Sequence, residues 1–154
     1  MGINELSLKL EQYPRIALDT SPIIYFVEAN PQYAPLATII FQKISQGSLL
    51  GFTSTISLTE VLVFPMYRQI PALQNAYYQL LRQSRNLSLV DINAEVATKA
   101  ASLRAKYKEN NLRTPDALQL AMALEANCPA FVTNDKRLSI VQELDVIVLD
   151  DFLK

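Results

Sequence analysis

Residues 16–22 read IALDTSP, and this stretch decides the fold class. Its first five residues, IALDT, begin as a short apolar run that is typical of a buried strand. Ser21 and Pro22 then form a typical helix start, with serine as the N-cap and proline at the first helical position. Asp19 therefore stands at the end of a predicted strand, just before a predicted helix.

The rest of the chain repeats this alternation of short apolar runs and longer amphipathic segments. Runs rich in Ile, Val and Leu between helical segments predict an α/β fold with a mostly parallel sheet. We expect the 154 residues to form a single domain, with residues 1–14 as an extension before the first strand. Further strands are predicted over residues 49–54, 88–92, 130–133 and 146–149, and helices over 22–30, 33–46, 94–109 and 114–126, with two more beginning near Ser57 and Pro71 and a kink or break at Pro65.

The chain has no histidine and one cysteine, which limits its chemistry. A Ser-His-Asp triad, a Cys-His dyad, a histidine-ligated metal and a CxxC motif are all excluded. A bound metal would have oxygen ligands, which points to Mg²⁺ or Mn²⁺. The net charge of −1 gives no overall attraction for nucleic acid. The charged N-terminus lacks a signal-peptide core and no stretch is typical of a membrane span, so a cytoplasmic protein is expected.

Four acids occupy comparable positions in this pattern. Asp19 and Asp135 follow predicted strands, Glu60 lies in the first turn of the helix that begins near Ser57, and Asp116 follows Thr114-Pro115, a second helix start. In a parallel α/β sheet, strand ends and the helix starts that follow them lie along one edge. Four clustered carboxylates repel one another unless a cation is present. The four acids together therefore predict a pocket for Mg²⁺ or Mn²⁺.

Each acid also has a purely structural explanation. Asp19 is suited to capping the following helix, and Ser57-x-x-Glu60 fits a capping box. Asp116 is favoured by the dipole of its helix, and Asn134-Asp135 fits an Asx turn. Taken one at a time, these explanations are favoured. The shared sheet edge favours the metal pocket for the four together.

Five blocks of sequence resemble the PIN-domain nucleases, and most closely the VapC-type toxins of bacterial toxin–antitoxin pairs. They are IALDTSPIIYF around Asp19, STISLTEVL around Glu60, TPDALQLAMAL around Asp116, FVTNDKRL around Asp135 and the closing VIVLDDF. The match runs from about Pro14 onward, and the third and fourth blocks are its most specific parts. The resemblance implies one PIN-like domain, in which helices cover both faces of a mostly parallel sheet.

The resemblance also implies roles for individual residues. Asp19 and Asp116 would be the principal ligands of Mg²⁺ or Mn²⁺, and Asp135 would complete the acidic pocket. Glu60 would act as a further ligand or through a metal-bound water, while Thr133 and Asn134 would orient the last acid by hydrogen bonds. The implied activity is endoribonuclease cleavage by a metal-activated water, which leaves a 5′-phosphate and a 3′-hydroxyl. The implied partners are RNA, a small antitoxin protein and a second copy of the chain.

Two other functions compete with this one. A phosphatase of the haloacid dehalogenase type also begins with a strand-end aspartate, but it needs a second acid at the position of Ser21. A catalytically silent PIN-like module that binds RNA or a partner protein usually lacks the acids, and all four are present here. Two departures from the family concern the subfamily and the toxin role, and neither touches the four acids. They are the residues before the first strand, and Asn127-Cys128-Pro129 in place of an acidic turn.

Basic and apolar groups outside the acids allow two interpretations each. The segment from Lys99 to Arg113 holds five bases and one acid. It is either a solvated helix face or a track for phosphates, and its candidates for contacts with the RNA backbone are Arg104, Lys106, Lys108 and Arg113. A second set is expected to be core or helix packing, with a dimer or antitoxin surface as the alternative: Phe64, Met66, Tyr67, Tyr77 and Tyr78.

Overall fold

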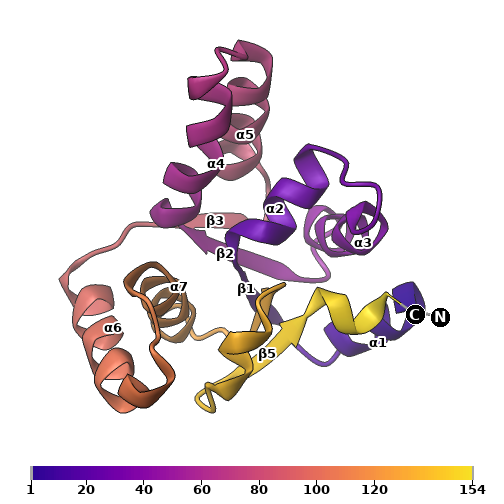
Figure 1. The fold of residues 1–154 in the computed structure, drawn as a ribbon. Helices are drawn as coiled ribbons and strands as arrows, with labels where there is room; N and C mark the ends of the chain where they lie inside the picture. Colours follow the sequence, from indigo (N-terminus) through magenta and orange to yellow (C-terminus); the bar gives the residue numbers. More distant parts are fainter. Residues whose placement is uncertain (1, 154) are drawn as a thin grey trace.

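A five-stranded parallel sheet lies at the centre of the computed structural model, which describes residues 2–153. Its strands are β1 (Arg15–Leu18), β2 (Leu50–Ser54), β3 (Leu87–Val90), β4 (Ala130–Thr133) and β5 (Asp145–Val148), in the order β3-β2-β1-β4-β5 (Figure 1). The predicted α/β class and every predicted strand are confirmed. Met1 and Lys154, the ends of the domain predicted over residues 1–154, lie outside the described residues.

Helices connect the strands and cover the sheet on both faces (Figure 1). They are α1 (Gly2–Leu10), α2 (Thr20–Val27), α3 (Ala34–Ser45), α4 (Thr55–Tyr67), α5 (Pro71–Gln83), α6 (Ala94–Lys106) and α7 (Thr114–Glu125), with 3-10 helices η1 (Lys108–Asn110), η2 (Lys136–Ile140) and η3 (Leu149–Phe152). No helix within residues 2–153 is both long and apolar enough to cross a bilayer.

The side chains of β1 and β4 show how the core is divided. Ile16 and Leu18 pack into the cluster formed with α1 to α5, whereas Ala17 between them packs against α6 and α7. In β4, Phe131 lies on the α6–α7 side and its two neighbours on the other. Successive strand residues point to opposite faces, so a strand buried on both faces must be apolar throughout. This explains the unbroken apolar runs in the sequence.

Three predicted helix starts are wrong by one to three residues. Asp19 caps α2, since its Oδ1 accepts a hydrogen bond from the Thr20 amide at 2.8 Å, and Ser21 lies within the helix. Ser54 caps α4 in place of Ser57. Arg113 occupies the N-cap position of α7, and Thr114 is already helical. For α2 and α4, the side chain at the strand end is itself the cap, so the helix begins without an intervening loop.

The shift at α4 changes two further expectations. Ser57 is buried inside the protein, so the capping box with Glu60 does not form, and Glu60 lies in the second turn of the helix. Of the kink or break predicted at Pro65, the break is absent, because α4 continues through this residue to Tyr67.

The N-terminal segment is part of the core. Leu6 and Leu10 of α1 are 0% and 1% exposed and belong to the same apolar cluster as α3. A Cβ on Gly2 would lie 1.7 Å from the carbonyl oxygen of Phe152, so only glycine fits where α1 meets η3 near the C-terminus (Figure 1). The sequence offers no proline or polar cap at the start of α1, which explains why this helix was not predicted.

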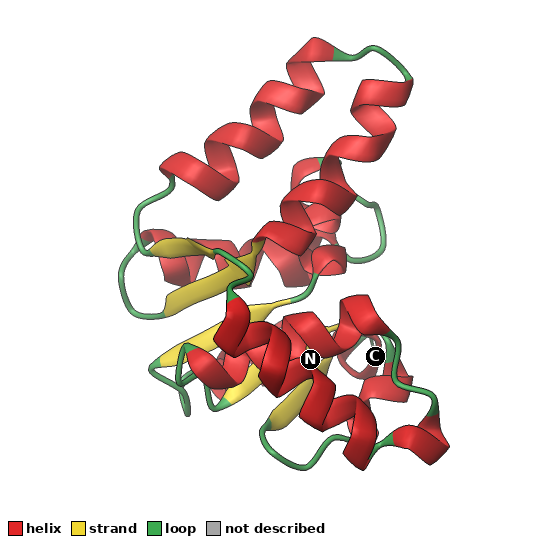
Figure 2. Ribbon diagram, turned by 90° about the vertical axis from the view of Figure 1, so that its left-hand side faces the viewer, coloured by secondary structure: helices red, strands yellow, loops and turns green. Residues whose placement is uncertain are grey.

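The α4–α5 pair projects away from the sheet (Figures 1 and 2). Of the aromatic and apolar residues expected to be core here, Tyr77 is buried at 0% exposure. The others are exposed, as are neighbouring apolar side chains: Val63, Phe64, Met66, Tyr67, Ile70 and Tyr78. The prediction of a packing role is therefore correct for Tyr77 and wrong for the exposed group, because the projecting helices have little else to pack against.

Candidate active site

All four predicted acids line one cavity of about 300 Å³. Asp19 follows β1, Asp135 follows β4, and Glu60 and Asp116 come from α4 and α7, so the cavity lies at the carboxyl edge of the sheet. The expectation that the topology gathers these acids is confirmed. The remaining lining residues are Thr20, Ser21, Ile24, Tyr25, Arg113, Thr133 and Asn134. A larger hollow of about 490 Å³ lies against α6 and is lined by Glu95, Lys99 and Glu125 among others, but by none of the four predicted acids.

Asp19 is half-buried and is held by neutral hydrogen-bond donors. Its Oδ1 accepts from the Thr20 amide at 2.8 Å, and its Oδ2 accepts from Thr133 Oγ1 at 2.7 Å. Burial raises the pKa of this carboxyl, the two hydrogen bonds partly oppose the rise, and the charges of Asp116 and Glu60 add to it. No Lys or Arg within residues 2–153 forms an ion pair with Asp19. None of the described residues therefore supplies its negative charge with a counterion.

Glu60 is joined to Asp19 through Thr20. The Thr20 hydroxyl donates to Glu60 Oε1 at 2.7 Å, while the Thr20 amide donates to Asp19. The same hydroxyl lies 3.2 Å from Ser57 Oγ. One residue at the start of α2 thus fixes two acids from different elements.

A buried polar network supports this side of the cavity, and Gln119 is its centre. Gln119 is 1% exposed; its Nε2 donates to Ser57 Oγ at 2.6 Å, and its Oε1 accepts from Ser54 Oγ at 2.6 Å. Ser57 Oγ also accepts from Thr53 Oγ1 at 2.8 Å. This network was not predicted from the sequence. The available signal was an amide in the apolar block ALQLAMAL, three residues after Asp116 and so on the same side of α7.

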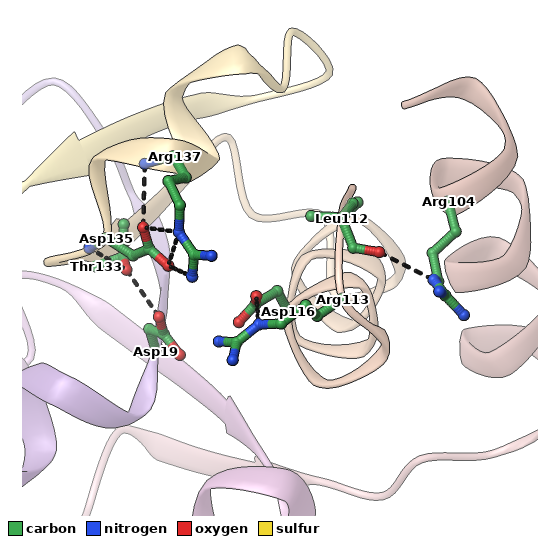
Figure 3. Close-up of polar contacts among 8 residues, drawn as sticks. All are labelled: Asp19, Arg104, Leu112, Arg113, Asp116, Thr133, Asp135 and Arg137. Carbon is green, nitrogen blue, oxygen red and sulfur yellow. Dashed lines mark hydrogen bonds and ion pairs between the residues drawn. The ribbon is translucent and has the colours of Figure 1, made fainter. Parts of the chain in front are cut away.

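Arginines hold the two acids on the other side of the cavity (Figure 3). Arg113 Nε lies 3.2 Å from Asp116 Oδ2. Arg137 Nε lies 2.9 Å from Asp135 Oδ1 and its Nη2 2.5 Å from Oδ2, while its amide also donates to Oδ1 at 3.0 Å. The bonds from Arg137 hold the pKa of Asp135 below its ordinary value. Arg137 was not among the residues predicted for the site.

Thr133 and Asn134 have different roles. Thr133 is buried and connects two acids, because its hydroxyl donates to Asp19 and accepts from the Asp135 amide at 3.1 Å. Asn134 was expected to orient Asp135. Its Nδ2 instead donates to the Tyr25 hydroxyl at 2.9 Å, and its Oδ1 accepts from the Asp150 amide at 2.8 Å. Asn134 therefore fastens the end of β4 to α2 and to η3.

The donors that line the cavity suit an oxygen-liganded divalent cation. Four carboxylates against two guanidinium groups leave two negative charges, which one divalent ion would balance. Ser21 Oγ, also in the lining, is buried and has no hydrogen-bond partner among the described residues. As the side chains stand, no three acids within residues 2–153 are grouped closely enough to ligate one ion. Asp116 and Asp135 are engaged with arginines in this arrangement.

Of the four bases predicted to contact RNA, Arg113 lines the cavity. Arg104 Nε donates to the Leu112 carbonyl at 2.9 Å, and Figure 3 shows its side chain directed there instead of to the acids. Lys106 Nζ pairs with Glu143 at 2.9 Å. Lys108 is exposed in η1. The structure thus brings one of the four bases to the acids and leaves three outside the cavity lining.

Comparisons with known proteins agree with the fold. The model of the PIN domain family matches residues 16–144. VapBC2 from Rickettsia felis, bound to a promoter DNA fragment, is similar with a TM-score of 0.68 and 16% identity over 86% of this chain and 96% of that chain. A toxin-antitoxin complex from Klebsiella pneumoniae is similar with a TM-score of 0.61 and 20% identity over 87% of this chain and 97% of that chain.

A third solved structure is that of Mycobacterium tuberculosis VapC20, a Sarcin-Ricin loop cleaving toxin. It gives a TM-score of 0.66 and 16% identity over 84% of this chain and 98% of that chain. At identities this low, the structural similarity establishes a shared fold and nothing further. A comparison with curated protein sequences finds no significant match.

Proposed function

The chain belongs to the PIN domain family, and from that premise we propose that it is a metal-dependent endoribonuclease, the toxin of a toxin–antitoxin pair. One observation carries the proposal: carboxylates from four separate elements line a single cavity at the carboxyl edge of a parallel sheet. RNA as the substrate is supported by VapC20, a protein of similar fold that cleaves the Sarcin-Ricin loop.

Asp19, Asp116 and Asp135 would hold the cation, with Glu60 as a further ligand or acting through water. An oxygen-only donor set and the absence of histidine favour Mg²⁺ or Mn²⁺. When bound, such an ion supplies a Lewis acid for the phosphate and lowers the pKa of a coordinated water.

The neighbouring residues keep the acids in place for this chemistry. Thr133 and the Thr20 amide orient Asp19, and the Thr20 hydroxyl orients Glu60. Arg113 at the cavity is suited to a phosphate next to the cleaved bond. The other three predicted bases would hold the RNA backbone further along: Arg104, Lys106 and Lys108.

The exposed apolar surface of the α4–α5 pair favours binding of a protein partner. Its exposed apolar side chains, with Tyr67 83% exposed, form a surface of the kind that marks protein–protein contacts. We propose that this surface contacts a second copy of the chain or an antitoxin protein. Size-exclusion chromatography with light scattering would show whether the purified chain is a dimer.

A catalytically silent PIN-like module remains the second candidate, and one observation favours it. Arg113 and Arg137 already neutralise two of the four acids, so the protein needs no cation to hold them. The two candidates differ in a direct assay, because a silent module would neither bind the cation at these acids nor cleave RNA.

Cleavage of a 5′-labelled single-stranded RNA tests the proposal. We expect cleavage with Mn²⁺ and none with EDTA, and products that carry 5′-phosphate and 3′-hydroxyl ends. Asp19→Asn and Asp116→Asn should abolish cleavage. Asp91→Asn is the matched control, because Asp91 follows β3 as Asp19 follows β1 but does not line the cavity. Equal cleavage by wild type and Asp19→Asn would contradict the proposal.

A further inference from the structure

Arg137 forms the most extensive contact with any acid of the cavity. Its guanidinium reaches both carboxylate oxygens of Asp135, with Nε at 2.9 Å from Oδ1 and at 3.2 Å from Oδ2, and Nη2 at 2.5 Å from Oδ2. The Arg137 side chain is nevertheless 66% exposed. It lies at the edge of the cavity on η2 and is held by this ion pair while remaining open to solvent.

The arrangement recurs on the neighbouring acid. Arg113, 59% exposed, pairs with Asp116, which is 13% exposed. The two pairs are also neighbours, because Asp116 of one pair and Arg137 of the other line the same small hollow. Two acids and two arginines therefore form one electrostatic group at the cavity (Figure 3).

A cation and Arg137 would compete for the same atoms. Both oxygens of Asp135 accept bonds from Arg137, so a metal at Asp135 would share these oxygens with a cationic guanidinium that it repels. Ligation by Asp135 therefore favours release of the guanidinium. Exposed ion pairs contribute little free energy, so the exchange is easily made.

The released guanidinium would correct the charge of the site. Four carboxylates with one divalent ion still carry two negative charges and would repel an RNA phosphate. Arg113 in the cavity lining and Arg137 at the edge of the cavity supply the two missing positive charges. A guanidinium freed from a carboxylate suits a phosphate in the same bidentate manner.

We propose that Arg137 is a phosphate-binding residue that is held on Asp135 until Asp135 ligates the divalent cation. The inference rests on the proposed function and adds a substrate contact to it. It predicts opposite effects of one substitution: loss of Arg137 strengthens cation binding, because a competitor is removed, and weakens RNA binding, because a phosphate contact is removed.

Two measurements on Arg137→Gln test this. Calorimetric titration with Mn²⁺ alone should show affinity roughly two- to fivefold higher than wild type. At saturating Mn²⁺, the KM for RNA cleavage should rise roughly tenfold or more, as expected when a charged hydrogen bond is removed. Lys136→Gln is the matched control: it removes the same charge one residue away, where Lys136 pairs with Asp150 at 3.1 Å. Its Mn²⁺ affinity and KM should match wild type.

Arg137→Lys separates charge from geometry and should give a KM between those of wild type and Arg137→Gln. The inference is overturned if Arg137→Gln matches Lys136→Gln in both measurements, if its Mn²⁺ affinity falls, or if its KM is unchanged. In these cases wild type still binds Mn²⁺ and cleaves RNA, so the proposed function stands. A wild type that does neither overturns the proposed function and this inference with it.

Discussion

The two sides of the acidic cavity are built differently. On the α2–α4 side, Asp19 and Glu60 are held by hydroxyl and amide groups, and Gln119 behind them is 1% exposed. On the α7–η2 side, Asp116 and Asp135 are held by arginines that are 59% and 66% exposed. The first side is a fixed frame, and the second is a set of contacts that can be exchanged.

The difference follows from the energetics of polar groups. A buried donor or acceptor that loses its partner costs the protein its full desolvation penalty, so the network around Gln119 must stay intact. Exposed ion pairs contribute far less. The fold therefore gives two acids a rigid position and leaves the other two able to change partners.

The largest effect is expected from Gln119→Leu. This change leaves the hydroxyls of Ser54 and Ser57 without their buried partner, and we expect the free energy of unfolding to fall by about 2–4 kcal/mol. Urea denaturation followed by circular dichroism measures it. Gln79→Leu, an exposed change on α5, is the control and should have little effect. Equal free energies of unfolding for the two variants would show that the network around Gln119 is not a rigid frame.

The second prediction concerns the pH dependence that Asp19 gives the metal-free protein. The folded pKa of Asp19 is raised above 3.8, so the folded state binds more protons than the unfolded state just above that pH. The free energy of unfolding should therefore fall as pH rises through this window. Asp19→Asn should flatten that slope, and asparagine keeps the helix cap. Denaturation in EDTA at several pH values would show it, and identical slopes would contradict the assignment.

The contribution of Asp135 to the free energy of unfolding should depend on pH in the opposite direction and more weakly. Its pKa is lowered by Arg137, so its pair stabilises the protein above pH 3.8 and the contribution disappears as pH falls through the folded pKa. Asp135→Asn should remove this acid-side loss in the same EDTA series, by less than the change at Asp19, because the arginine is exposed. If Asp19→Asn and Asp135→Asn change the slope of the free energy of unfolding against pH in the same direction, the contrast between the two sides of the cavity is wrong.

The smallest effect is expected outside the cavity, at Lys106 and Lys108. If both bind the RNA backbone, Lys106→Ala with Lys108→Ala lowers the slope of log K against log salt by roughly 0.7 for each phosphate that is no longer bound. RNA binding would be measured at several salt concentrations, with Asp19→Asn added to prevent cleavage. An unchanged slope would make these bases a solvated face, in keeping with the Lys106–Glu143 pair.

The strands of the sheet and the gathering of the acids at one edge could be predicted from the sequence. Strands buried on both faces are continuous apolar runs, and Asp19 and Asp135 directly follow two of them, so their shared edge could be predicted. Helix starts were less certain, because Ser54 and Ser57 are equally good caps by residue type. Only the packing of Ser57 against Thr53 and Gln119 decides between them.

The contacts that distinguish the two sides could not be predicted in the same way. Gln119 meets Ser57 across 62 positions of sequence, and no periodicity encodes that pairing. Arg137 is only two residues from Asp135, but an exposed arginine after an acid is common on protein surfaces, and its bidentate contact depends on the turn into η2. Neither the long-range pairing of Gln119 nor the local geometry at Arg137 follows from residue type and spacing alone.

A crystal structure of the protein grown with Mn²⁺ would show directly whether the four acids bind a cation, because the anomalous signal locates the ion. We expect one anomalous peak in the cavity, ligated by Asp19, Asp116 and Asp135, with Arg137 released from Asp135. This expectation would be contradicted by crystals of protein that cleaves RNA with Mn²⁺ but shows no peak in the cavity while both arginine pairs remain intact.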